Sequence, residues 1–345
     1  MAGEPRILIA GGSGVFGRVL ARELLKTTSA RLVIAARDAH RAAAVCRSLA
    51  APHRVEPLAL DLAIPGDLSR AAQGCFAVAC TAGPFKGLPA ELPRVAVEAG
   101  AHWLDIADDP RWLLPLLSRS ALGRDAEHRG LAVAPGLSTT PSLSGALVRS
   151  CLERLPVARR AQITLFIGNR NSKGAAAIAS VLGGGLTDPC PVRLPIGRRI
   201  AYRFPSADAG LLGKELGLAA EFRVAFEIPV AGGLLAGLSP YARRLSPVGR
   251  ARLARLISAV AAPAGRLGSA SGILQVELAA EGGQTAACAL VGAGQRLPIL
   301  PCALAFEGLL DGSLDGRGLI QPSTWLPPAD WLHRLTARGL GFRSW

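Results

Sequence analysis

The chain has 345 residues, half of them hydrophobic and 19% charged, so it is long enough for about two domains and too apolar for global disorder. Its 39 basic residues outweigh 25 acidic ones and give a formal net charge of +14, a balance that can indicate nucleic acid or an anionic surface as partner. The arginines are spread along the sequence, however, and aromatic residues make up only 5%, so we expect no nucleic-acid partner.

Cysteine usage and the N-terminus indicate the compartment. The seven cysteines include no C-x-x-C pair and the five histidines do not cluster, which argues against a disulfide framework and against a zinc site. The chain begins without the regions of a secretory signal, and no apolar stretch is long enough to span a bilayer. We therefore expect a cytoplasmic protein without a bound metal, while the overall hydrophobicity leaves peripheral membrane contact open.

The first third of the sequence alternates between strand and helix patterns. Short apolar runs predict buried strands over Arg6–Ala10, Arg31–Ala36, Val55–Leu60, Phe76–Thr81 and Trp103–Ala107. Apolar residues at helical spacing predict helices from Phe16 to about Thr27, after Asp38, over Asp67–Ala72 and from Leu92 to Ala99. This alternation predicts an α/β fold with a Rossmann-type, doubly wound parallel sheet.

Four glycines lie between the first predicted strand and the first predicted helix. Glycines can mark no more than a tight turn. Here they fit G-x-G-x-x-G spacing after a strand and before a helix, which is typical of a dinucleotide-binding turn. The backbone N–H groups would then face a pyrophosphate, assisted by the positive end of the helix. The residues expected at the pyrophosphate are Gly11, Gly12, Ser13, Gly14, Val15, Phe16 and Gly17.

The end of the second predicted strand indicates which dinucleotide binds. An NAD site usually carries an acidic residue here for the ribose 2′-OH, whereas this chain has Arg37, with Asp38 displaced to the helix N-cap. A guanidinium can pair with a 2′-phosphate through charge-assisted hydrogen bonds, so the sequence favours NADP(H) over NAD(H). The alternative is that Arg37 is only solvated and that Asp38 reaches the ribose.

Two further strand ends complete the expected cofactor site. Asp61 and Leu62, at the end of the third predicted strand, are expected beside the adenine. The segment TAGPF leaves the fourth predicted strand where the nicotinamide ribose should lie. Its residues are Thr81, Ala82, Gly83, Pro84 and Phe85.

These segments carry a resemblance to a known family. In order and spacing, AGGSGVFG, AARD, LDL, TAGPF and EAGAHWLDIADDP are similar to the N-terminal domain of the saccharopine dehydrogenase-like oxidoreductases. The resemblance covers residues 5–140, including APGLSTTPSLSGAL, and returns near the end in LAFEGLLDGSLDGRGLIQPSTWL. One departure is that many relatives have Gly-Glu where this chain has Asp108 and Asp109, which puts substrate contacts there in doubt.

The resemblance implies three regions: a Rossmann domain over residues 1–135, a substrate and dimerisation α+β domain over 136–298, and a C-terminal helix and tail, 299–345, that return to the Rossmann domain. The second domain of the family is built on a mixed sheet, and it often makes the contact of a homodimer. Segments of this chain that fit such a sheet are Gln162–Gly168, Phe222–Pro229 and Ile273–Ala280, the last turning into a hairpin at Gly282–Gly283. Helical spacing continues over Arg243–Ala261.

Acid and base candidates on the nicotinamide side are few. The predicted catalytic residues are Lys173, Asp105 and Asp108. Lys173 could orient a substrate anion or donate to a developing oxyanion, together with Ser172. It could equally be a solvated loop charge, and Asp108 or Asp109 could simply cap a helix that starts at Pro110.

Two functions remain open. The first is an NADP(H)-dependent oxidoreductase that transfers hydride to or from a C=O, C=N or C=C bond of a small or lipid-like substrate. The second is a sensor or scaffold that binds the dinucleotide without turnover. The sequence has no Tyr-x-x-x-Lys pair, which argues against a short-chain dehydrogenase mechanism. His102 is a further acid/base candidate, and the alternative is a surface residue at a strand start.

Overall fold

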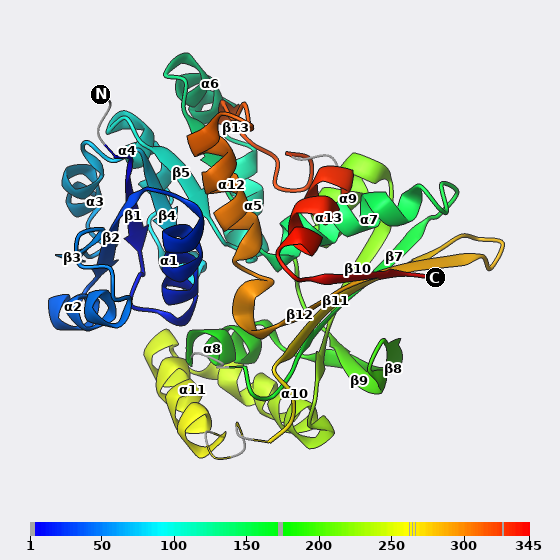
Figure 1. Cartoon of the computed structure of the whole chain (residues 1–345). Helices are drawn as coiled ribbons and strands as arrows, with labels where there is room; N and C mark the ends of the chain where they lie inside the picture. The colour runs from blue at the N-terminus through cyan, green and yellow to red at the C-terminus, as the bar shows by residue number, and fades with distance from the viewer. Residues whose placement is uncertain (1–3, 172–174, 262, 264, 266, 326–327) are drawn as a thin grey trace. The chain divides into compact units, whose positions relative to one another are not determined.

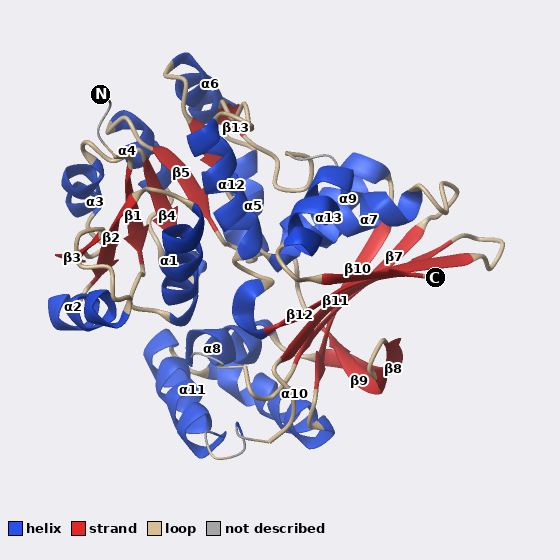
Figure 2. Cartoon of the chain, in the orientation of Figure 1, coloured by secondary structure: helices blue, strands red, loops and turns tan. Residues whose placement is uncertain are grey.

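The computed structural model describes residues 4–171, 175–261, 263, 265, 267–325 and 328–345. Contacts between residues divide the chain into two units. Figure 1 colours the chain from its N-terminus to its C-terminus. The first unit comprises residues 1–142 and 298–325, and the second comprises residues 143–297 and 326–345. Each unit is built on its own sheet (Figure 2).

The first unit alternates strands and helices, as the sequence predicts. Its strands are β1 (Arg6–Ala10), β2 (Arg31–Ala36), β3 (Val55–Ala59), β4 (Ala77–Cys80), β5 (His102–Asp105), β6 (Ala132–Ala134) and β13 (Gly318–Leu319). Its helices are α1 (Val15–Thr27), α2 (Ala39–Ser48), α3 (Pro65–Ala72), α4 (Leu92–Glu98), α5 (Pro110–Leu117), α6 (Ser120–His128) and α12 (Leu300–Asp311). A short turn η1 (Phe85–Gly87) follows β4, and a π-helical turn η2 (Thr139–Leu143) ends at the first residue of the second unit.

The described strands of the first unit form one parallel sheet in the order β13–β6–β5–β4–β1–β2–β3. Strands β1, β2 and β4 are almost wholly buried, which explains why they are continuous apolar runs rather than alternating ones. The strand order reverses at β1, so the carboxyl ends of β1 and β4 form the switch point where ligands of such sheets bind. The predicted doubly wound parallel sheet is confirmed.

The second unit carries a mixed sheet, as expected. Its strands are β7 (Arg160–Ile167), β8 (Thr187–Leu194), β9 (Gly197–Arg203), β10 (Ala219–Phe226), β11 (Ser271–Ala279), β12 (Thr285–Ala293) and β14 (Gly341–Ser344), in the order β14–β12–β11–β7–β10–β9–β8. Strands β7 and β10 are parallel, and the other neighbours are antiparallel. The helices are α7 (Ser144–Leu152), α8 (Ala175–Gly184), α9 (Asp208–Leu216), α10 (Pro229–Arg244), α11 (Pro247–Ala261) and α13 (Pro328–Ala337), with a short turn η4 (Gly294–Arg296) after β12.

Three expectations from the sequence differ from what the structure shows. The helical pattern over Arg243–Ala261 spans two helices, because α10 ends before Pro247, which starts α11. Residues 299–345 do not all return to the first unit, since β14 pairs antiparallel with β12 and thereby completes the second sheet. His102 is not a surface residue but is only 9% exposed.

Within the described parts of the chain, no helix combines the length and apolarity required to cross a bilayer.

Candidate functional site

The glycine turn after β1 is packed too closely for side chains at three of its positions. Gly11 has φ +82°, and a Cβ added there would lie 2.7 Å from the backbone N of Ala82. A Cβ at Gly17 would lie 2.6 Å from both the Gly11 O and the Gly12 Cα. A Cβ at Gly12 would meet the Ile34 side chain at 2.9 Å. The turn therefore needs glycine to fit between the ends of β1, β2 and β4.

Helix α1 begins in this turn with an open N-terminus. Gly14 is its N-cap, no side chain caps it, and its first turn holds no acidic residue. A Cβ at Gly14 would meet only the Gly11 O, at 3.1 Å, so the backbone can be approached closely here. Uncapped N–H groups together with the positive end of the helix dipole suit an anion such as a pyrophosphate.

The end of β4 is fixed beside the glycine turn. Both the backbone N and the Oγ1 of Thr81 donate to the Ala10 carbonyl oxygen, at 2.9 and 3.0 Å. The ring of Phe85 is buried and lies 5.7 Å from the ring of Trp112, centroid to centroid, whereas Gly83 and Pro84 are exposed. The structure thus brings the predicted TAGPF segment next to the predicted pyrophosphate turn.

Strand β2 is followed by an arginine and by an aspartate that caps the next helix. Asp38 is the N-cap of α2, and its Oδ1 accepts hydrogen bonds from the backbone N of His40 at 2.8 Å and of Arg41 at 3.3 Å. Arg37 is exposed beside it. The capping bonds use Oδ1 of Asp38, and the exposed guanidinium of Arg37 beside it is a cation that can pair with a phosphate.

The end of β3 has an analogous arrangement. Asp61 Oδ1 accepts from the backbone N of Ala63 at 3.0 Å, and Leu62 is 6% exposed. Because β3 is next to β2 in the sheet, these two residues follow a strand neighbouring the one that Arg37 follows.

Asp105 ends β5 as a fully buried carboxylate. Its Oδ2 accepts from the indole Nε1 of Trp103 and of Trp112, each at 3.0 Å, and its Oδ1 accepts from the backbone N of Ala107 at 3.0 Å and of Gly136 at 2.9 Å. Burial raises the pKa of Asp105, and the four N–H donors offset part of that effect. The Asp105 carboxylate thus holds helix α5, through Trp112, and the loops that carry Ala107 and Gly136 at the carboxyl end of β5. Sequence reasoning missed Trp112 and Gly136 as its partners.

The other acid and base candidates are placed differently. Asp108 is exposed, and Asp109 caps α5 while pairing with Arg111. Partial burial raises the pKa of Asp109, but the hydrogen bonds from Arg111 outweigh it and hold that pKa below its ordinary value. His102 accepts a hydrogen bond on Nδ1 from the backbone N of Ala132 at 2.8 Å, and burial lowers its pKa, so it is a neutral structural residue. Lys173 and Ser172 lie outside the described residues.

The second unit contains another buried carboxylate, which the sequence analysis did not predict. Asp208, at the start of α9, is fully buried and accepts hydrogen bonds from the Oγ of Ser144 at 2.6 Å and of Ser206 at 2.7 Å. Burial raises its pKa from 3.8 to about 6, although the two hydroxyl donors act in the opposite direction. The Ser206–Asp208 spacing before a helix is the only local signal that could have found it.

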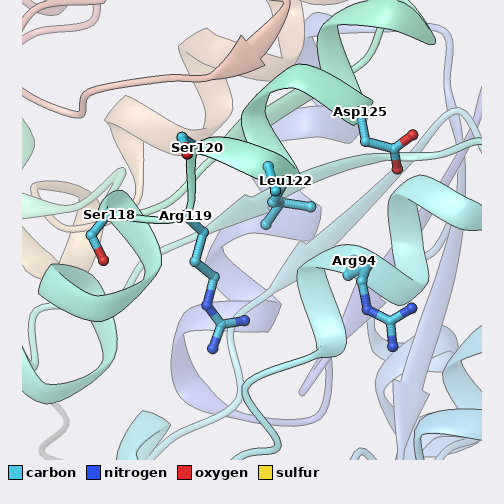
Figure 3. A pocket seen from close by; sticks show the side chains of 7 residues that line it. Arg94, Ser118, Arg119, Ser120, Leu122 and Asp125 are labelled. Atoms are coloured by element: carbon cyan, nitrogen blue, oxygen red, sulfur yellow. The ribbon is translucent and has the colours of Figure 1, made fainter.

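A hollow of about 410 Å³ opens beside α4 and α6 in the first unit (Figure 3). Its lining includes Arg94, Ser118, Arg119, Ser120, Leu122 and Asp125. Arg119 donates to the Ala90 carbonyl oxygen at 2.7 Å, and Arg94 pairs with Glu98. The first contact links the residue before α6 to the segment before α4, and the second lies within α4. None of the predicted site residues lines the hollow.

Comparison with known proteins finds a family match within the first unit. Residues 7–127 match the model of a family described as the saccharopine dehydrogenase NADP binding domain. The matched residues are similar to this family, and they include the glycine turn and the TAGPF segment, as the resemblance implies. A comparison with the curated proteins found no match.

Solved structures extend the likeness to the whole chain at the level of fold. Apo saccharopine dehydrogenase (L-Glu forming) from Saccharomyces cerevisiae matches with a TM-score of 0.64 and 13% identity, over 99% of this chain and 100% of that chain. GenD2 from gentamicin A biosynthesis, in complex with NAD, matches with a TM-score of 0.44 and 13% identity, over 100% and 97%. A metagenomic short-chain oxidoreductase in complex with NADP has a TM-score of 0.31 and 22% identity, over 38% and 80%.

Proposed function

We propose that the chain is an NADP(H)-dependent oxidoreductase of the saccharopine dehydrogenase-like type. The observation that carries this proposal is the open N-terminus of α1 in a glycine turn, combined with an exposed Arg37 and an Asp38 carboxylate that caps α2. The nicotinamide, when bound, supplies or accepts the hydride, and the protein supplies binding, orientation and electrostatics.

Each predicted cofactor residue then has a role. The N–H groups of the glycine turn and of the first turn of α1 would hold the pyrophosphate. Arg37 would hold the 2′-phosphate, with Asp61 and Leu62 beside the adenine. The segment from Thr81 to Phe85 would hold the nicotinamide ribose. In this arrangement Asp105 is a positioning residue, because its hydrogen bonds hold helix α5 through Trp112 and the loop after β6 through Gly136.

The substrate side rests on fewer residues. Asp108, exposed after β5, and Lys173 remain the groups proposed to handle a proton or to orient the substrate. The substrate would be a small or lipid-like molecule with a C=O, C=N or C=C bond. The family resemblance supports a homodimer, and the cysteine usage supports a cytoplasmic location.

A dinucleotide-binding sensor or scaffold is the second candidate. It is favoured by the burial of Asp105, which keeps one of the three predicted catalytic groups away from any substrate.

Two measurements separate these candidates. Calorimetric titration with NADPH and NADH should show tighter binding of NADPH, and absence of binding by either would contradict the proposed site. The absorbance of NADPH is then followed with a panel of imines, ketones and enoyl compounds. Oxidation with any panel member supports the oxidoreductase, whereas tight binding without turnover across the panel supports the sensor.

A further inference from the structure

Helix α10 exposes a continuous row of apolar side chains. Val230, Leu234, Leu238, Tyr241 and Leu245 are 68, 63, 39, 69 and 42% exposed. At 3.6 residues per turn these positions fall within an arc of about 80°, so they form one stripe along the helix and its C-cap. Scattered single apolar residues are ordinary on a protein surface, but a contiguous row marks an interaction surface.

Helix α11 repeats this pattern with a cation in the row. Val248, Leu256 and Val260 are 62, 61 and 73% exposed. Arg252 lies between Val248 and Leu256 at the same four-residue spacing and is exposed as well. The exposed face of α11 is therefore both apolar and basic.

The hydrophobic core of the second unit fixes which faces of the two helices stay outside. Leu235 and Ala242 of α10, with Ala254 of α11, pack in one cluster with Ile178 and Leu182 of α8. The stripes lie on other faces of α10 and α11 than the residues in this cluster. They cannot turn inward without breaking the cluster.

The charge of this region has a single sign. From residue 228 to residue 276 the sequence contains six arginines and no lysine, aspartate or glutamate. Arg250 caps the C-terminus of α10, donating to the carbonyl oxygens of Ala242 at 3.1 Å and Leu245 at 3.2 Å. Arg244, Arg252 and Arg255 are exposed and lie within or next to the stripes at helical spacing.

We infer that this α10–α11 surface, defined by the two apolar stripes and these three exposed arginines, docks on an anionic lipid bilayer. Leucine, valine and tyrosine side chains partition into the boundary between headgroups and acyl chains, while guanidinium groups contact lipid phosphates. The long arginine side chain can reach a phosphate while its methylene groups stay against apolar atoms. A second copy of the chain would bring two positive surfaces together, and a nucleic acid would leave the apolar stripes uncovered.

Vesicle flotation of the full chain tests this inference. The probes are vesicles of phosphatidylcholine alone and of equimolar phosphatidylcholine and phosphatidylglycerol. The chain should float with the anionic vesicles, and less so as salt is added. R252Q/R255Q should lower the partition coefficient about 25-fold, since each arginine near an anionic surface contributes roughly five-fold. L234S/Y241S should lower it by at least about ten-fold, because two apolar side chains leave the interface.

Two control variants remove the same kinds of side chain at positions outside this surface. V157S removes an apolar side chain that is 60% exposed between α7 and β7, and R47Q/R124Q removes two exposed arginines of the first unit. Both should float like the unchanged chain, and circular dichroism melting should show all variants folded. The inference is overturned if the unchanged chain does not float with anionic vesicles, or if the controls lose as much binding as the surface variants. It is also overturned if L234S/Y241S dissociates a dimer in sedimentation equilibrium while flotation is unchanged.

Discussion

Replacing Gly17 with alanine adds one methyl group at the closest contact of the glycine turn. The new Cβ would lie 2.6 Å from the Gly11 O, 2.6 Å from the Gly12 Cα and 2.9 Å from the Thr81 Oγ1. Two of these three atoms are backbone, so the turn or α1 must shift, and overpacking of this kind costs about 1–3 kcal/mol in the free energy of unfolding. If the shift misaligns one charged hydrogen bond to a pyrophosphate, the loss of about 1.5–3 kcal/mol weakens NADPH binding roughly 10- to 150-fold.

Urea denaturation measures the first effect and calorimetric titration with NADPH the second. A glycine of the same unit provides the control. Gly66→Ala, at the second residue of α3, meets nothing within 4 Å, so it should not lower the unfolding free energy and should leave NADPH affinity unchanged. A Gly17→Ala protein with unchanged stability and unchanged NADPH affinity would refute the close-packing argument.

Three further changes test the remaining residues. Arg37→Ala should weaken NADPH binding by about 1.5–3 kcal/mol and leave NADH binding nearly unchanged, while Arg47→Ala changes neither; equal losses for both cofactors would remove Arg37 from the 2′-phosphate site. Asp105→Asn should lower the unfolding free energy by about 2–4 kcal/mol in urea denaturation, because an amide NH₂ cannot accept from the N–H donors around it, and an unchanged midpoint would contradict this. Asp208 has its pKa raised from 3.8 to about 6, so its proton stabilises the native state fully below about pH 4, and this stability is lost as pH rises through about 6. That contribution is ~3 kcal/mol, and Asp208→Asn should abolish this part of the pH dependence; identical pH profiles for the two proteins would show that the carboxyl does not titrate there.

Several features of the first unit could be predicted from sequence because they are local. Strands β1 and β2 are uninterrupted apolar runs, and the structure gives them the predicted bounds, Arg6–Ala10 and Arg31–Ala36. The glycine turn is equally local, since its spacing directly follows one strand and precedes one helix. The N-cap role of Asp38 could be predicted for the same reason, because its partners His40 and Arg41 are two and three residues away.

Edge strands of the second sheet could not be predicted in this way. Strand β8 contains Pro189 and Pro191, which argue against a strand in any sequence reading. The structure tolerates them because β8 is the last strand of its sheet, where a missing N–H interrupts no ladder on the outer side. Strand β14 is four residues long, and its pairing with β12 joins segments about fifty residues apart.

The neighbouring aspartates after β5 show what the sequence alone leaves undecided. The run from Asp105 to Asp109 offers three carboxylates, and nothing in it distinguishes them. Only the tertiary structure gives Asp105 a fully buried site, with Gly136 as a donor from 31 residues away. Burying a carboxylate is costly unless hydrogen-bond donors surround it, and such donors come from loops that only the assembled sheet brings together.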